Sequence, residues 1–139
     1  MHSTTSKLHY TMAHVRRRML KEIEDIKNDT YISPFFSLAC AQDNLYIWSA
    51  NIHCLPDFRH EGKNYNLEIL CPPDYPFKPP IVKFLDPVDC ICVSNATGLL
   101  RLDILNKEWS PGLTLTSIMH SIISVLMDNE PQRHSPRFT

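Results

Sequence analysis

The chain has 139 residues, of which 43% are apolar and 21% are charged, which suits one compact domain and leaves little room for a second. Fourteen Lys and Arg residues nearly balance fifteen Asp and Glu residues, giving a formal net charge of -1. Such a chain has no broad positive field that would hold a nucleic-acid backbone or an anionic bilayer. We therefore expect neither nucleic acid nor a membrane among its partners.

The expected compartment follows from the N-terminus and the cysteines. No apolar stretch approaches the roughly twenty residues of a membrane span. Residues 1–7 are polar and lack the apolar core of a secretion signal. An odd number of cysteines in such a chain argues against a disulfide framework. We expect a cytoplasmic or nuclear protein, or one found in both, with reduced thiols at Cys40, Cys54, Cys71, Cys90 and Cys92.

The N-terminal region predicts a flexible leader followed by a helix. Residues 1–13 show no hydrophobic period, whereas apolar residues recur at helical spacing from Ala13 to about Asn28. We therefore expect a leader over residues 1–13 and a domain over residues 14–139. Three consecutive Arg residues (16–18) in this helix resemble a nuclear or nucleic-acid patch. Acidic residues one turn later are placed to pair with them, so a solvated helix face is the favoured interpretation.

Four short strands are predicted after the first helix. Ser37–Ala41 and Leu45–Cys54 flank a polar turn, and Tyr65–Cys71 alternates apolar and polar residues. A loop rich in proline, which interrupts strands and helices, then leads into Ile81–Phe84. One face of the second strand is expected to be buried, and it carries Trp48, Ala50, Ile52 and Cys54.

The C-terminal part predicts an irregular segment and a second helix. Residues 85–100 have no clear period, a pattern that often marks a site. Thr114 or Thr116 is suited to cap a helix that ends at Asp128–Asn129 and Pro131. Its apolar side is formed by Ile118, Met119, Ile122, Val125 and Leu126. A helix, a strand meander, an irregular loop and a second helix together predict an α+β domain.

Four motifs in one order resemble the ubiquitin-conjugating enzymes. They are DNLYIW at residues 43–48, YPFKPP at 75–80, LDIL at 102–105 and WSPGLT at 109–114. The likeness extends from about Arg16 to Pro131. It implies an N-terminal helix, a four-stranded antiparallel meander and a central helix. The two further C-terminal helices of the family are missing from this chain, which thus resembles the shortened, inactive variants that act as partners of an active enzyme.

The resemblance also implies a loss of chemistry. Family members carry a cysteine two residues before the aspartate of the LDIL motif, where it accepts ubiquitin as a thioester. Arg101 stands there in this chain. A guanidinium stays protonated and only donates hydrogen bonds, so it cannot attack a carbonyl carbon. The family's His-Pro-Asn tripeptide, whose Asn supports the oxyanion, should fall within Asp89–Val93, and no side-chain amide occurs there. We expect a chain that is not an enzyme and has no cofactor.

Cys90 and Cys92 are candidates for a relocated acceptor in an atypical conjugating enzyme. A nucleophilic thiol needs a depressed pKa and an open approach. The carboxylate of Asp89 next door is expected to raise the thiol pKa instead, so packing is the favoured role. A zinc site is disfavoured because two cysteines with one residue between them are closer than the usual ligand pair, and no second pair stands at a matching distance. The histidines, including His53 and His60, are expected at the surface.

The resemblance implies a ligase-docking surface made by the first helix and two loops. The matching residues are Arg17 and Lys21 in the helix, Phe77 and Lys78 in one loop, and Ser110 and Pro111 in the other. An exposed Phe on proline-stiffened backbone is a good anchor, because little entropy is lost on docking. The alternative is that Phe77 and Pro111 only pack the two loops together. Trp48, Trp109 and Tyr75 are expected to be structural.

Ser37 matches a serine on the outer face of the family's sheet, a surface that binds a second, non-covalent ubiquitin in some members. The alternative is an ordinary solvent-facing strand serine. The resemblance therefore implies three kinds of partner: an active ubiquitin-conjugating enzyme, a ubiquitin ligase, or ubiquitin. An adaptor that uses the same fold in an unrelated complex is a further hypothesis.

Overall fold

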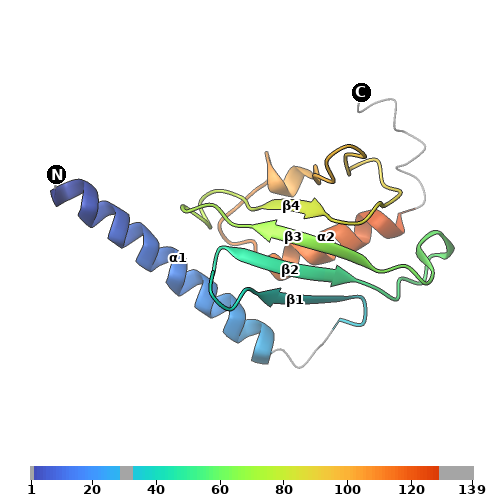
Figure 1. Cartoon of the computed structure of the whole chain (residues 1–139), viewed down its shortest axis with the longest axis horizontal. Helices are drawn as coiled ribbons and strands as arrows, with labels where there is room; N and C mark the ends of the chain where they lie inside the picture. The colour runs from blue at the N-terminus through green and yellow to red at the C-terminus, as the bar shows by residue number, and fades with distance from the viewer. Residues whose placement is uncertain (1, 29–32, 129–139) are drawn as a thin grey trace.

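The structure, a computed structural model, describes residues 2–28 and 33–128. The elements in chain order are helix α1 (His2–Asn28), strands β1 (Phe36–Cys40), β2 (Ile47–Ile52), β3 (Tyr65–Leu70) and β4 (Ile81–Phe84), and helix α2 (Leu115–Met127). Two short 3-10 turns, η1 (Phe58–His60) and η2 (Asp103–Leu105), lie in the connections. The strands form one antiparallel sheet in the order β1-β2-β3-β4, with α2 across one face and α1 at one end (Figure 1). The predicted α+β meander is confirmed.

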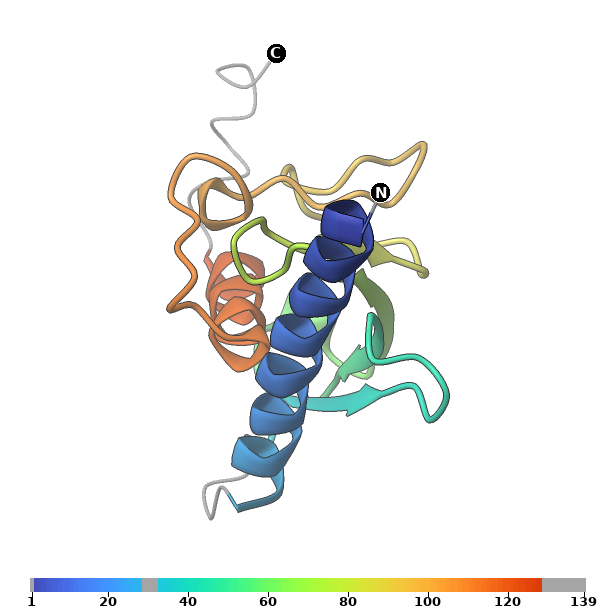
Figure 2. The ribbon, with the colours of Figure 1, turned by 90° about the vertical axis from the view of Figure 1, so that its left-hand side faces the viewer.

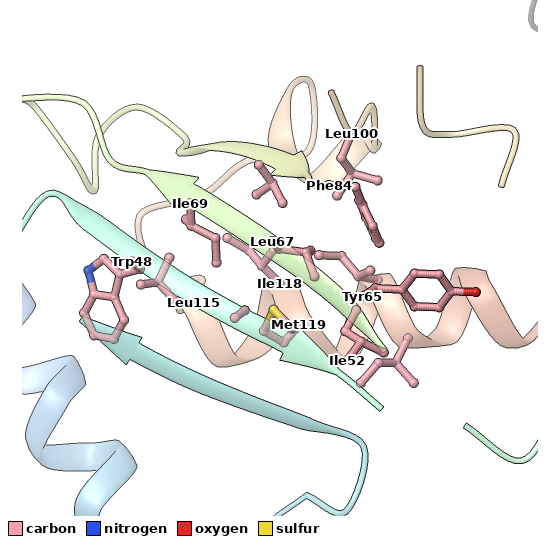
Figure 3. Packing of buried hydrophobic residues seen from close by; sticks show 14 of the residues in the cluster. Trp48, Ile52, Tyr65, Leu67, Ile69, Phe84, Leu100, Leu115, Ile118 and Met119 are labelled. Atoms are coloured by element: carbon pink, nitrogen blue, oxygen red, sulfur yellow. The ribbon is translucent and has the colours of Figure 1, made fainter. Parts of the chain in front are cut away.

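The core lies between the inner face of the sheet and α2 (Figure 3). Successive strand side chains point to opposite faces, so alternate residues of β2, β3 and β4 turn toward the helix. Each large apolar side chain buried in this way contributes about 1.5–3 kcal/mol. The buried residues are Trp48, Ala50, Ile52, Tyr65, Leu67, Ile69, Val82 and Phe84 from the sheet, and Leu115, Ile118, Met119, Ile122, Ile123 and Leu126 from α2.

Helix α2 begins with a reciprocal cap. The Thr114 hydroxyl accepts a hydrogen bond from the Ser117 N–H at 3.1 Å, and the Ser117 hydroxyl accepts one from the Thr114 N–H at 3.4 Å. These bonds satisfy backbone donors that the first turn of a helix leaves without partners. Thr114 is therefore the cap, and Thr116 is not. The helix ends at Met127; Asn129 and Pro131, which were expected to stop it, lie outside the described residues.

The start of α1 corrects the prediction. The helix begins at His2 and not at Ala13, as expected, so residues 2–13 are helical. The flexibility of the leader stays a prediction. No proline or glycine occurs between His2 and Asn28, so nothing in this stretch breaks the helix. The N-terminal half of α1 extends past the edge of the sheet (Figure 1). Within residues 2–28 and 33–128, neither helix combines the length and apolar character needed to cross a bilayer.

Cys54 and His60 are further corrections. Cys54 was expected on the buried face of β2, but the pairing with β1 ends at Ile52, and Cys54 is exposed with a positive φ of 59°. His60 was expected at the surface and is buried. Its Nδ1 lies 2.6 Å from the Tyr65 hydroxyl and its Nε2 lies 2.9 Å from the Leu126 carbonyl oxygen. Because a carbonyl only accepts, Nε2 donates to Leu126 and ties the end of α2 to the sheet.

Gly98 provides a test of how closely the irregular segment packs on β4. Gly98 has a φ of +79°, and a Cβ at this position would collide with the carbonyl oxygen of Phe84. Gly62 has a similar φ of +72° but open space around the same position. We expect Gly62→Ala to cost about 1–2 kcal/mol through backbone strain alone. Gly98→Ala should cost a further ~1–3 kcal/mol because of the collision. Urea unfolding of both variants measures the difference, and equal unfolding midpoints would contradict it.

Candidate protein-docking surface and the Arg101 position

A buried carboxylate joins three segments of the chain. Glu22 of α1 is 3% exposed. Its Oε1 accepts a hydrogen bond from the N–H of Leu115, the first residue of α2, at 2.8 Å. Its Oε2 accepts from the Tyr75 hydroxyl at 2.5 Å and from Arg18 Nε at 3.1 Å. A buried charge is costly unless it is paired and hydrogen-bonded. The Glu22 carboxylate meets both conditions, because it pairs with Arg18 and accepts hydrogen bonds from Tyr75 and Leu115.

Arg18 extends this network to the loop before α2. Its Nη1 donates to the Pro111 carbonyl at 2.7 Å and its Nη2 donates to the Leu113 carbonyl at 2.6 Å. The guanidinium carbon also lies 5.5 Å from the centre of the Tyr75 ring, a cation–π arrangement. Burial and the neighbouring Glu22 charge raise the pKa of Tyr75, so its phenol remains a neutral donor.

Trp109 joins the two loops that were predicted to dock a ligase. Its indole Nε1 donates to the Pro76 carbonyl at 2.9 Å, and its ring centre lies 6.0 Å from that of Tyr75. The Tyr75–Pro76 peptide bond is cis. Tyr75 is buried and Trp109 is half-buried, so the structural role predicted for both is confirmed.

The six predicted docking residues are exposed and come from segments that this network holds side by side. Phe77 is 69% exposed, and the Lys78 ammonium makes an ion pair with Asp74 at 3.4 Å, with 70% of the Lys78 side chain exposed. Figure 2 shows the loop between β3 and β4 and helix α2 on the same side of α1. The remaining four, all exposed, are Arg17, Lys21, Ser110 and Pro111.

Phe77 does not pack the two loops together. That contact is made by Tyr75 and Trp109, whereas most of the Phe77 ring faces solvent. The exposure of Phe77 argues against the alternative in which it only packs the loops, and its role in docking stays a prediction. Arg17 and Lys21 precede Arg18 and Glu22 by one residue each, so they lie about 100° around the helix from the two residues that hold the loops. The structure thus places exposed basic and aromatic side chains on a rigid frame. Which partner binds there stays a prediction.

Arg101 lies in a short extended segment beside β4. Its N–H donates to the Cys92 carbonyl at 2.8 Å, and the N–H of the preceding Leu100 donates to Val82 of β4 at 2.9 Å. The side chain is exposed, and the guanidinium forms no hydrogen bond or ion pair with another of the described residues. The backbone therefore fixes where this cation emerges, and the cation itself is open to solvent.

Cys90 and Cys92 occupy one turn opposite this segment. The turn is closed by a bond from the Val93 N–H to the Cys90 carbonyl at 3.1 Å. Cys90 is buried and Cys92 is half-buried. The neighbouring Cys90 thiol lowers the pKa of Cys92 to about 7, whereas the pKa of Cys90 is raised. The expectation that both thiols have raised pKa values is thus wrong for Cys92.

Ser37 lies on the outer face of the sheet, as predicted. It is exposed on the edge strand β1 and pairs in register with Asn51, which pairs with Asn66. Asn51 Nδ2 donates to Asn66 Oδ1 at 3.0 Å, so this end of the outer face is polar. Its role in binding ubiquitin stays a prediction. Among the described residues, no three His, Cys, Asp or Glu side chains converge on a metal-sized site.

Glu22 and Arg18 are the site residues that the sequence interpretation missed. Glu22 was expected to pair with the arginines on a solvated face of the helix; the ion pair with Arg18 is present, but the carboxylate is buried. It lies in the apolar stripe, however, between the positions of Met19 and Ile26, and Arg18 is four residues before it. An acidic residue inside an apolar stripe with a cation at this spacing is the signal that would have found the pair.

The comparison with known proteins decides the family. Residues 18–137 match the family model described as ubiquitin-conjugating enzyme. The chain belongs to the ubiquitin-conjugating enzyme family. It is 34% identical over 116 residues to the protein PEROXIN-4 of Arabidopsis thaliana, covering 84% of this chain and 74% of that relative. Its fold is similar to the E2 domain of a Toxoplasma gondii ubiquitin conjugating enzyme, with a TM-score of 0.72, 34% identity, and coverage of 84% of this chain and 77% of that one.

A substitution of Glu22 tests the network. Glu22→Gln keeps the volume but removes the charge and directs an amide N–H₂ at donors, so we expect it to lower the free energy of unfolding by about 1–3 kcal/mol. Glu24→Gln on the exposed side of the same helix should change it by less than about 0.5 kcal/mol. Chemical unfolding of the two variants and the wild type gives both values. Equal stabilities of the two variants would show that the buried carboxylate has no special role.

Proposed function

We propose that this member of the ubiquitin-conjugating enzyme family is a non-catalytic variant that regulates conjugation by binding other proteins of the pathway. The observation that carries the proposal is Arg101 at the position of the acceptor cysteine. A guanidinium stays protonated at neutral pH and has no free lone pair that could attack a carbonyl carbon. The family scaffold around it is complete from α1 to α2 within the described residues.

A second feature supports the same proposal. The segment Asp89–Val93, where the family's Asn is expected, forms a turn that contains two cysteines and no side-chain amide. An oxyanion that developed next to Arg101 would lack this donor. The loss of both the nucleophile and its supporting amide favours a protein whose function is binding.

The exposed surface around Phe77 is the proposed binding site. Phe77 supplies an apolar anchor on a frame that Glu22 and Trp109 hold rigid, so little entropy is lost when a partner binds. Arg17 and Lys21 add positive charge, which would attract an acidic partner. A ubiquitin ligase is the partner that this combination favours, with an active conjugating enzyme and ubiquitin as the other candidates.

A second candidate function is an atypical conjugating enzyme that uses Cys92 as the acceptor. Three observations favour it: Cys92 is half-buried rather than buried, its pKa is lowered, and its carbonyl bonds the backbone of Arg101. Cys90 is a poor candidate because it is buried and its pKa is raised. The nearby carboxylate of Asp103 opposes a thiolate on Cys92, and no amide in the turn would support the oxyanion.

A charging assay with activating enzyme, ATP and ubiquitin distinguishes the two candidates. We expect no thiol-reducible ubiquitin adduct on the wild-type chain. An adduct that disappears in Cys92→Ser but remains in Cys54→Ser would establish the second candidate instead.

Arg101→Cys should also fail to transfer ubiquitin efficiently, because the absent oxyanion donor is worth about 2.7–4 kcal/mol in other enzymes. Rapid discharge from Arg101→Cys onto lysine would contradict this.

The docking surface is tested with two exposed phenylalanines. Phe77→Ala should weaken binding to a ligase domain at least about tenfold, equivalent to about 1.4 kcal/mol. Phe58→Ala is the matched control, because Phe58 is 80% exposed but lies in η1, outside the proposed surface. Titration calorimetry against a panel of ligase domains, with labelled ubiquitin in parallel, measures both. If Phe77→Ala and Phe58→Ala lose the same affinity, the proposed docking surface is refuted. If the wild type binds neither ubiquitin nor any ligase domain, the hypothesis that remains is an adaptor in an unrelated complex.

A further inference from the structure

The turn at Cys90–Val93 brings two thiols together in a way that the other cysteines of the chain do not share. One residue separates Cys90 from Cys92, and the turn between them is closed by the Val93 N–H bond to the Cys90 carbonyl. The Cys90 thiol is close enough to Cys92 to lower the pKa of the Cys92 thiol. A chain reversal of this kind keeps the two Cα atoms within the range that a disulfide spans.

The two thiols have different environments. Cys90 is 6% exposed and belongs to the core cluster, whereas Cys92 is partly open to solvent. The Cys90 thiol stabilises a thiolate on Cys92, whose pKa is lowered to about 7. A partly accessible thiolate with a second thiol two residues away in the same turn is the arrangement found in cysteines that respond to oxidants.

We propose that Cys90 and Cys92 form a peroxide-sensitive dithiol site that closes reversibly to an internal disulfide. This inference concerns the chain's own thiols and does not rest on the proposed function. It adds a modification site beside Arg101, where the family would carry its acceptor cysteine.

The reaction balances with a hydroperoxide as oxidant. The Cys92 thiolate attacks one peroxide oxygen, the O–O bond breaks, and hydroxide leaves and takes up a proton, which gives a sulfenic acid on Cys92. The Cys90 sulfur then attacks the Cys92 sulfur, an S–S bond forms, and the sulfenic oxygen leaves as water with the Cys90 proton. The two electrons lost by the sulfurs reduce the peroxide. An external dithiol reduces the Cys90–Cys92 disulfide back to two thiols.

The remaining cysteines lack one part of this arrangement each. Cys71 is buried and its pKa is raised by burial and by Glu22, and burial also raises the pKa of Cys40. Cys54 is exposed, but it is not paired with another thiol among the described residues. Simple exposure therefore predicts that Cys54 reacts first, whereas the paired geometry predicts that Cys92 does. The two expectations are opposite, which makes the site testable in the wild-type chain.

The test uses the folded full-length chain treated with hydrogen peroxide and then alkylated. Trypsin cleaves after Lys83 and Arg101, and the peptide between them contains Cys90 and Cys92 and no other cysteine. We expect this peptide to become unreactive toward alkylation and lighter by two hydrogen atoms before the Cys54 peptide is modified. Treatment with dithiothreitol should restore two alkylation sites. Oxidation of Cys54 first, or of both peptides at equal rates, would overturn the proposal.

Variants separate the two roles. Cys90→Ser should leave the sulfenic acid on Cys92 unresolved, so that dimedone traps it in place of the disulfide. Cys92→Ser should leave Cys90 reduced and open to alkylation after unfolding. Cys54→Ser is the matched control and should form the internal disulfide at the wild-type rate. A disulfide that joins Cys54 to either thiol, or a Cys90 that oxidises in Cys92→Ser as fast as in the wild type, would show that the pair is not the site.

Discussion

The buried Glu22 carboxylate is the interaction on which the arrangement of this molecule depends. It receives hydrogen bonds from the hydroxyl of Tyr75 and from the first N–H of α2, and it pairs with Arg18, which in turn bonds two carbonyls of the loop before α2. Helix α1, the loop with Phe77 and the start of α2 are therefore all bonded to one carboxylate. An apolar residue in its place would fill the space but would leave the helix terminus and Arg18 without their partner.

The Glu22 network does not include the side chain of Arg101. Arg101 is exposed, and only its backbone takes part in the pairing with the Cys92 segment. Any residue with a backbone N–H can make that bond, so the side chain at position 101 takes no part in the core or in the Glu22 network. The scaffold and the acceptor are thus separable, which is why a family fold alone does not establish a family activity.

The sequence predicted the elements well because their signals are local. Alternation in the strands, helical spacing from Val15 onward and the cap at Thr114 are all properties of neighbouring residues, and each reappears in the structure. Other features depend on contacts across the fold. Glu22 and His60 carry polar side chains that are usually solvated, and their partners, Tyr75 and Leu126, are distant in sequence. The lowered pKa of Cys92 was not predicted from the sequence, because the prediction considered the charge of Asp89 but not the effect of the Cys90 thiol.

One continuous segment links the Arg101 position to the docking surface. After Arg101, the turn η2 is followed by Trp109, whose N–H donates to Asn106 at 3.3 Å and whose indole donates to Pro76 in the loop that carries Phe77. The segment is tied at its start to Cys92 and at its end to that loop. In a catalytic relative, such a connection would hold a loaded acceptor at a fixed place relative to a bound ligase. In this chain the same connection ties the backbone that carries the Arg101 cation to the loop that carries Phe77.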